Sequence, residues 1–313
     1  MSTSGSSNWS QTRNEIIADA FYGLGIYRTG STVSSADYTW AASVLNRMIK
    51  GWQTKGIHIW AEEEGALFLT DGQSKYTLSD STTDKVGKNP NQANLTADCT
   101  STTVTVNSTS GMTASDNIGI AKDNNTMHWT IIVSVDSSTQ LTITSAPATT
   151  ASSGNAIFTY TSAVGRPLFL TGARLQMKSG IEREIKIAGH TEFMAMAIKQ
   201  TDGPVTLVHY APKTTTGNMY VYMVPTDVNE CIRFSYARSI EDFDSSSDNA
   251  DIPAEWYDAL ELNLELRIAR AKGINISKTY PELVSLAGNA LLEAQLYDVD
   301  SGSVRIVPKD RWE

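Results

Sequence analysis

Hydrophobic side chains recur every three to four residues near both ends of the chain, which is the spacing of one helix face. Two such runs follow Thr12 and Ser34, and two more follow Pro253 and Pro281. Each of the first two begins with a capping box, formed by Thr12 with Glu15 and by Ser34 with Asp37. The pattern therefore predicts four amphipathic helices, two at each end of the chain.

The period changes from helical to alternating after residue 62. Residues 66–70 alternate, and Asp71-Gly72 is a turn signal before residues 75–78, which predicts a β-hairpin. From residue 79 to 161 Thr, Ser, Asn and Asp dominate, and short alternating runs are separated by turn signals. This spacing is typical of a small antiparallel barrel or sandwich. We expect its core to contain Val104, Ile118, Trp129, Ile131, Leu141 and Phe158.

The order of these runs predicts the domain organisation of the 313 residues. The expected fold class is α+β: a helical bundle, an antiparallel β region and an inserted small β barrel or sandwich. The expected parts are residues 1–78 (helical hairpin and first β-hairpin), 79–165 (inserted β domain), 166–250 (β region), 251–300 (C-terminal helices) and 301–313 (extended arm).

One stretch of about forty residues has a specific order of elements. It contains Leu45-Asn46-Arg47, then Trp52, Gly56 and Trp60, then Glu64-Gly65, and a strand at 67–69 followed by Gly72-Gln73-x-x-Tyr76-x-Leu78. This order resembles the head-to-tail adaptor proteins of short-tailed bacteriophages, also called tail accessory or packaged-DNA stabilisation proteins. A more distant similarity is to tail tubular protein A. The resemblance resumes at residues 251–256 and covers the C-terminal helices.

The resemblance implies a structural virion protein of the neck that is assembled in the host bacterial cytoplasm. Its subunits would form a ring, dodecameric in the family, with the helical bundle as the ring body. The implied partners are further copies of the chain, the portal protein, the next tail or nozzle protein and the genomic DNA in the channel. Such a ring would retain packaged DNA, let it pass during ejection and provide a docking surface for the tail, without enzyme activity.

Composition narrows the remaining function classes. A net charge of −9 and a pI near 5.0 are the wrong sign for tight phosphate binding, so DNA is expected to pass without sticking. No apolar run is long enough to span a membrane, and residues 1–9 lack the features of a signal peptide. The two cysteines, Cys99 and Cys231, are expected to be buried free thiols.

The residues that carry chemistry in other proteins do not form a recognisable catalytic or metal motif in this sequence. Glu62, Glu63 and Glu64 are consecutive, so their side chains point in different directions and predict a solvated junction. The four histidines fall in separate elements without metal-ligand spacing, and there is no phosphate-binding glycine loop. We therefore expect no catalytic residues, no metal and no cofactor.

Two segments are predicted to make contacts between molecules. The helix after Pro253 has a second apolar stripe beside the one that faces the core, which predicts an oligomer interface at Trp256, Leu262, Leu266 and Ala269. The tail after Ser301-Gly302-Ser303 is predicted to dock on the portal or a neighbouring subunit. The residues of this arm are Val304, Arg305, Ile306, Val307, Lys309, Arg311 and Trp312.

Two other function classes remain open from the residues alone. One is a cell-wall-degrading tail enzyme that uses Glu62 or Glu64 as its acid. The other is a glycan-binding decoration formed by the inserted β domain, although Trp129 is the only tryptophan in that segment.

Overall fold

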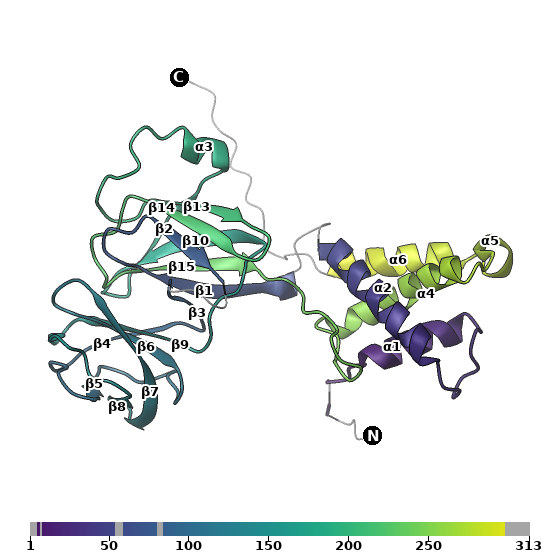
Figure 1. The fold of residues 1–313 in the computed structure, drawn as a ribbon, viewed down its shortest axis with the longest axis horizontal. Coiled ribbons are helices and arrows are strands. Elements are labelled where there is room, and N and C mark those ends of the chain that lie inside the picture. The colour runs from purple at the N-terminus through teal and green to yellow at the C-terminus, as the bar shows by residue number, and fades with distance from the viewer. Residues whose placement is uncertain (1–4, 7, 54–58, 80–83, 298–313) are drawn as a thin grey trace. The chain divides into compact units, whose positions relative to one another are not determined.

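The computed structural model describes residues 5–6, 8–53, 59–79 and 84–297. The chain divides into two compact units. The helical unit comprises Met1–Ala61 and Ile240–Glu313, and the β unit comprises Glu62–Ser239 (Figure 1). The β unit is therefore one continuous segment between the two parts of the helical unit.

The helical unit contains the helices that the hydrophobic pattern predicts. They are α1 (Arg13–Gly23), α2 (Ser35–Gln53), α4 (Tyr257–Ala271) and α6 (Leu283–Tyr297), with the short α5 (Ile276–Thr279) and the 3-10 turns η1 (Ile59–Ala61) and η2 (Ala254–Trp256). The capping box at Thr12 is present, because its side chain accepts from the Glu15 amide and the Glu15 carboxylate accepts from the Thr12 amide. The Ser34 hydroxyl likewise accepts from the Asp37 amide at 3.2 Å.

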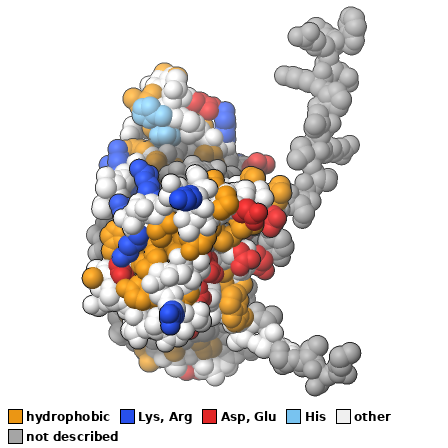
Figure 2. Space-filling view, turned by 90° about the vertical axis from the view of Figure 1, so that its right-hand side faces the viewer, with side chains coloured by type: hydrophobic (Ala, Val, Ile, Leu, Met, Phe, Trp, Pro, Cys, Tyr) orange, Lys and Arg blue, Asp and Glu red, His pale blue; other side chains and the backbone are white. Residues whose placement is uncertain are grey.

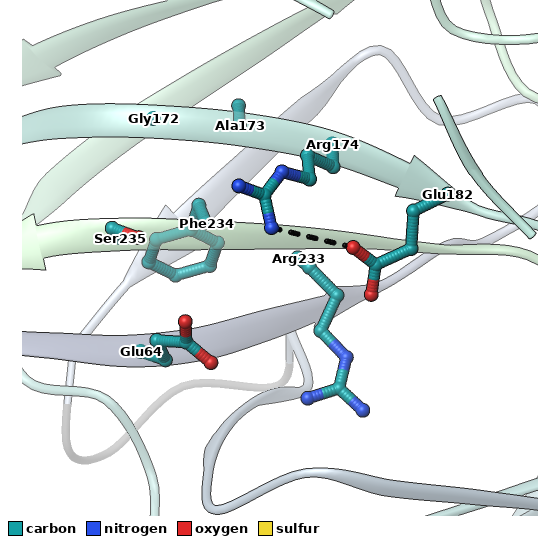
Figure 3. Close-up of a pocket in the computed structure, with 8 residues that line it drawn as sticks. All are labelled: Glu64, Gly172, Ala173, Arg174, Glu182, Arg233, Phe234 and Ser235. Carbon is teal, nitrogen blue, oxygen red and sulfur yellow. Dashed lines mark hydrogen bonds and ion pairs between the residues drawn. The ribbon is translucent and has the colours of Figure 1, made fainter. Parts of the chain in front are cut away.

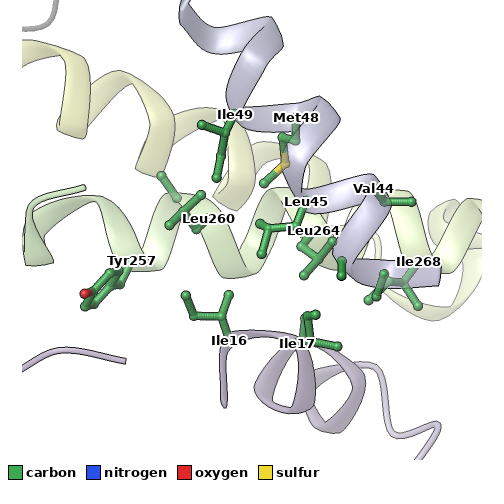
Figure 4. Packing of buried hydrophobic residues seen from close by; sticks show 14 of the residues in the cluster. Ile16, Ile17, Val44, Leu45, Met48, Ile49, Tyr257, Leu260, Leu264 and Ile268 are labelled. Atoms are coloured by element: carbon green, nitrogen blue, oxygen red, sulfur yellow. The ribbon is translucent and has the colours of Figure 1, made fainter. Parts of the chain in front are cut away.

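Helix α4 lies at the centre of the helical unit and contacts α1, α2 and α6. Its residues Leu260, Leu264 and Ile268 are fully buried among side chains of α1 and α2 (Figure 4). The α1 and α2 side chains around them in that view are Ile16, Ile17, Val44, Leu45, Met48 and Ile49. A helix covered from three sides needs a wide apolar surface, which explains why α4 has two adjoining apolar stripes.

Two sheets of the β unit share one hydrophobic core. The five-stranded sheet has the order β11-β10-β15-β1-β3, and the four-stranded sheet has the order β12-β13-β14-β2. Leu67, Ile232 and Phe234 of the first sheet are buried with Tyr76, Val208 and Val221 of the second. The strands of the first sheet are β1 (Glu62–Phe68), β3 (Val86–Lys88), β10 (Phe169–Gln176), β11 (Glu182–Glu184) and β15 (Cys231–Ala237). Those of the second are β2 (Lys75–Leu78), β12 (Lys186–Ile187), β13 (Leu207–Pro212) and β14 (Gly217–Tyr222), and the short helix α3 (His190–Met194) follows β12.

The hairpin predicted at residues 66–78 does not form, so that prediction was wrong. Strand β1 pairs with β15 and β3, whereas β2 pairs with β14 in the other sheet. The turn itself is present, because Gly72 adopts a positive φ of 73° and the Thr70 amide donates to the Tyr76 hydroxyl at 3.0 Å. The chain therefore turns from one sheet to the other instead of returning along β1.

The third sheet has six strands in the order β4-β9-β6-β7-β8-β5. These are β4 (Asn91–Asn94), β5 (Thr103–Thr105), β6 (Asn117–Ala121), β7 (Met127–Ser137), β8 (Gln140–Ile143) and β9 (Ala156–Tyr160). Leu95, just after β4, bridges Val106, just after β5, and the Thr96 amide donates to the Thr105 carbonyl at 3.0 Å. These contacts join the two edge strands, so the sheet closes into a small barrel.

The barrel has its own core, but not all of the predicted residues are in it. Val104, Ile118 and Leu141 are fully buried there. Phe158 and Trp129 instead pack in a seam against Phe68 of β1, and Ile131 is 47% exposed. Strand β3 lies within residues 79–165 but belongs to the five-stranded sheet. The domain boundaries at 79 and 165 stay a prediction.

The expected fold class, with a helical bundle as the main body, was wrong. The larger of the two units, residues 62–239, is built from three β-sheets, and only 26% of the structure is helical. The long helices lie near the ends of the chain, because residues 62–239 contain runs that alternate at the period of strands and pair with partners far away in sequence. Within this segment the short α3 is helical. The helical unit is thus the smaller part of a mostly β protein.

Candidate functional site

The exposed surface of α6 is the candidate site for contacts with other molecules. Leu283, Ala287 and Ala294 of this helix are buried in the helical unit, and the Asn263 side chain of α4 donates to the Ala287 carbonyl at 3.0 Å. The other sides of α6 expose large hydrophobic side chains. These are Val284 (59% exposed), Leu286 (50%), Leu292 (57%) and Leu296 (73%).

The composition of α6 makes this exposure unusual for a surface helix. Glu293 is the only charged residue among its fifteen residues, LVSLAGNALLEAQLY. Ser285, Asn289 and Glu293 form a narrow polar stripe, and the apolar surface of α6 is wider than one core-facing stripe needs. The side of the molecule at which α5 lies also shows a broad hydrophobic area between separate groups of acidic and basic side chains (Figure 2). The structure therefore leaves α6 covered on one face only.

The sequence pattern predicts an oligomer interface on α4, and this assignment stays a prediction. Of the four predicted interface residues, Trp256 and Ala269 are buried in the core of the helical unit. Leu262 and Leu266 are partly buried and pack against the same core. The chain's own helices therefore cover much of the second stripe. The signal that sequence reasoning missed was the near absence of charge in α6.

The predicted docking arm, residues 304–312, lies outside the described residues, and so does His58. The assignment of Val304, Arg305, Ile306, Val307, Lys309, Arg311 and Trp312 to a docking arm stays a prediction.

The three consecutive glutamates lie at the start of β1 and have different surroundings. Glu62 accepts a hydrogen bond from the Thr171 hydroxyl. Glu64 lines a cavity of about 60 Å³ beside Arg174, Glu182 and Arg233, in which Arg174 is directed toward Glu182 and Arg233 lies apart from that pair (Figure 3). The carboxyl groups of Glu62 and Glu64 thus do not share a polar partner among the described residues.

Glu63 lies on the other face of β1 in an ion-pair network. It lies 3.0 Å from both Lys88 Nζ and Arg238 Nε, and the Tyr236 hydroxyl donates to it at 2.8 Å. Burial by itself would raise the pKa of Glu63, but the hydrogen bonds and charges of these partners outweigh it and lower the pKa. A general acid of a glycosidase needs a raised pKa, so Glu63 is tuned in the opposite direction.

Helices α1 and α4 bring together carboxyl groups that have few partners. Glu265 of α4 is only 7% exposed and lies so close to Gly23 of α1 that a Cβ at Gly23 would come within 1.9 Å of its Oε1. Burial, with a smaller contribution from Glu261, raises the pKa of Glu265 to about 7. Burial also raises the pKa values of Glu261 and Asp19. A larger residue at position 23 would therefore displace the Glu265 carboxyl group.

No group of three or more potential metal-ligating side chains occurs in the described part of the chain. Cys99 and Cys231 are buried free thiols, and burial raises the pKa of Cys231 to about 12, which leaves it unreactive. Among the described helices, none is long and apolar enough to cross a membrane.

No protein-family model matches this chain, and a comparison with curated proteins found no match. The functional proposal therefore depends on the order of the motif elements in residues 45–78 and on the surfaces described above.

Proposed function

We propose that the chain is a structural subunit of the head-to-tail connector of a short-tailed bacteriophage. In this proposal it forms a closed ring with further copies of itself, binds the portal on one side and the next tail protein on the other, and belongs to the neck of the virion. The observation that carries the proposal is the order of elements from Leu45 to Leu78 together with residues 251–256.

Several motif residues lie at core and turn positions of the fold, which supports the family resemblance. Trp52, from the first stretch, and Trp256, from the second, pack against each other with ring centroids 5.9 Å apart. Leu45 and Leu67 are fully buried, and the Tyr76 hydroxyl holds the turn at Gly72 through the main chain of Thr70. The motif therefore specifies core and turn positions, which is what a family resemblance in the fold requires.

The exposed face of α6 supports an assembling protein over a monomeric enzyme. Large apolar surfaces on a soluble chain usually mark contacts with other molecules, and subunits of obligate assemblies bury about 2,000 Å² or more. The net charge of −9 supports a channel that DNA passes without sticking, because carboxylates repel phosphates. We propose no step of chemistry for this chain.

Mass photometry and negative-stain electron microscopy of the purified protein, alone and with portal, test the proposal. We expect a discrete ring-sized species in at least one of the two samples. The double variant Leu292→Asp/Leu296→Asp should stay monomeric with an unchanged melting temperature, since both side chains are exposed in the monomer.

The matched control is Thr39→Asp/Ser43→Asp, which adds the same charges at the same spacing on the exposed side of α2. This control should assemble like the wild type. A wild-type chain that stays monomeric with and without portal contradicts the connector function. Normal assembly of the Leu292/Leu296 variant contradicts only the role of α6.

A further inference from the structure

A second cavity lies within the β unit, where the barrel meets the end of β1. Its volume is about 360 Å³. It is lined by Phe68, Thr70, Asp71, Lys85, Asn125, Thr126, Met127, Trp129 and Val228. Cavities near this size are at the lower end of small-molecule sites. None of the assembly surfaces described above includes it.

Aromatic side chains from distant parts of the sequence form one wall of this cavity. The Trp129 ring lies 5.1 Å from that of Phe68 and 5.7 Å from that of Tyr160. Gly119 on the neighbouring strand leaves room for the indole, since a Cβ at that position would come within 2.7 Å of it. Trp129 is thus held in one orientation by its neighbours while its ring remains partly exposed.

Polar groups surround this aromatic wall. Lys85 Nζ lies over the Trp129 ring, 6.0 Å from its centroid. Asp71 lines the same cavity, and within the described residues neither its carboxylate nor the Lys85 ammonium has a hydrogen bond or an ion pair. Opposite charges that share a cavity without pairing leave an acceptor and a donor available to a ligand.

The turn before β7 contributes further residues to the rim of the cavity. Asn125 has a positive φ of 57°, and its side chain is used internally: it donates to the Thr226 carbonyl at 2.9 Å and accepts from the Val228 amide at 3.2 Å. These bonds attach the barrel turn to the loop before β15. The barrel and the loop before β15 therefore both contribute to the rim, and a ligand would contact both.

We propose that this cavity binds a pyranose ring of a neutral glycan. A pyranose has an apolar face of C–H groups that packs on an aromatic ring, and a rim of hydroxyls that both donate and accept hydrogen bonds. The partly exposed Trp129 ring, supported from behind by the buried Phe68, matches the first feature, and Asp71 with Lys85 matches the second. The two opposite charges disfavour a strongly charged ligand. This inference does not depend on ring assembly.

The test is saturation-transfer NMR of the full chain with a panel of neutral saccharides. The panel contains glucose, galactose, mannose, N-acetylglucosamine, N-acetylgalactosamine and their β-linked disaccharides, each at about 10 mM because single-ring ligands bind weakly. We expect transfer to at least one member. Asp71→Asn and Lys85→Gln should each weaken that binding about fivefold, the effect of losing one hydrogen bond.

The matched controls are Glu184→Gln and Lys213→Gln, which remove the same charges at exposed positions of the β unit outside this cavity. Both should bind like the wild type. Trp129→Phe should also weaken binding. If the Trp129→Phe protein does not fold, the binding measured with Asp71→Asn tests the proposal. The proposal is overturned if no saccharide of the panel shows transfer, or if transfer persists unchanged in the Asp71 and Lys85 variants.

Discussion

The two units of this protein bury their hydrophobic residues in different ways. The helical unit has one core around α4, and its peripheral helix α6 is covered on one face only. The β unit has separate cores inside the barrel, between the two other sheets and in the seam at Phe68. Sheets that pack face to face, or close on themselves, seal their apolar sides within the chain. A helix at the edge of a small bundle does not, so α6 exposes Val284, Leu286, Leu292 and Leu296. The β unit also exposes large apolar side chains, among them Ile131 and Val133 of β7.

Each unit contains carboxylates with raised and with lowered pKa values, and two groups of them show opposite causes. In the helical unit, burial raises the pKa values of Glu265, Glu261 and Asp19. In the β unit, hydrogen bonds from neighbouring serines and threonines lower the pKa values of Asp123 and Asp136. The surroundings of the first group disfavour its ionised form, whereas those of the second group favour it. These two groups of carboxylates should therefore contribute to the pH dependence of stability with opposite signs.

The largest expected effect comes from a cavity in each core. Leu45→Ala in α2 and Leu141→Ala in the barrel each truncate a fully buried side chain and should cost about 2–5 kcal/mol. Hydrogen-exchange mass spectrometry should show faster exchange mainly in the helices for Leu45→Ala, and mainly in strands β4–β9 for Leu141→Ala. Equal acceleration in both units for either variant would show that the cores are not separate.

The second prediction concerns the seam between the barrel and β1. A Cβ at Gly87 would come within 2.1 Å of Tyr160, so Gly87→Ala should destabilise the β unit by about 1–3 kcal/mol through overpacking. Gly172→Ala is the matched control on the same sheet, since the nearest atom would be 4.0 Å away. Urea denaturation followed by tryptophan fluorescence measures both. A Gly87→Ala protein as stable as the Gly172→Ala control would contradict the seam packing.

The third prediction uses the buried glutamate of the helical unit. The folded-state pKa of Glu265, about 7, lies above its ordinary value of 4.5, so stability falls as the pH rises from 4.5 to 7. Glu265→Gln removes this loss and should stabilise the unit at pH 8 by up to about 2 kcal/mol, after allowance for solvent screening. At pH 4.5 the variant and the wild type should be similar.

Thermal unfolding followed by circular dichroism at the two pH values measures this effect. Glu255→Gln, at an exposed position of the same unit, serves as the control and should change stability little at either pH. A Glu265→Gln variant that is less stable than the wild type at pH 8 would mean that the carboxylate is stabilised by its surroundings.

The smallest effect is expected for Asp136 in the barrel. Hydrogen bonds from the Ser134 and Thr142 hydroxyls, both at 2.7 Å, lower its pKa below 3.8. Its contribution is therefore present above pH 3.8 and is lost as the pH falls through the folded-state pKa. Asp136→Asn should be slightly less stable than the wild type at pH 7, with the difference shrinking under strongly acidic conditions, as urea midpoints can show. A stability difference that grows as the pH falls would mean that the pKa of Asp136 is raised, not lowered, in the folded protein.

The sequence alone determined the features that depend on neighbouring residues. The capping box at Thr12 and the turn at Gly72 are present as predicted, and at Ser34 the hydroxyl caps the Asp37 amide while the Ser34 amide donates to the Tyr27 hydroxyl instead of Asp37. Each depends on hydrogen bonds or dihedral angles within a few residues, so a local pattern is enough. The same local reading correctly predicted the four long helices and a β region after residue 166.

Only the tertiary structure decided which elements meet. Glu62 pairs with Ala237, so β1 has its partner at the other end of the β unit, and β2 lies in another sheet despite a good turn sequence. Phe68 and Trp129 form one wall although a whole series of strands separates them. Likewise, α4 is covered by α1, α2 and α6, which leaves α6 as the exposed apolar helix. Periodicity shows that a face is apolar, but what covers that face depends on contacts between residues far apart in the chain.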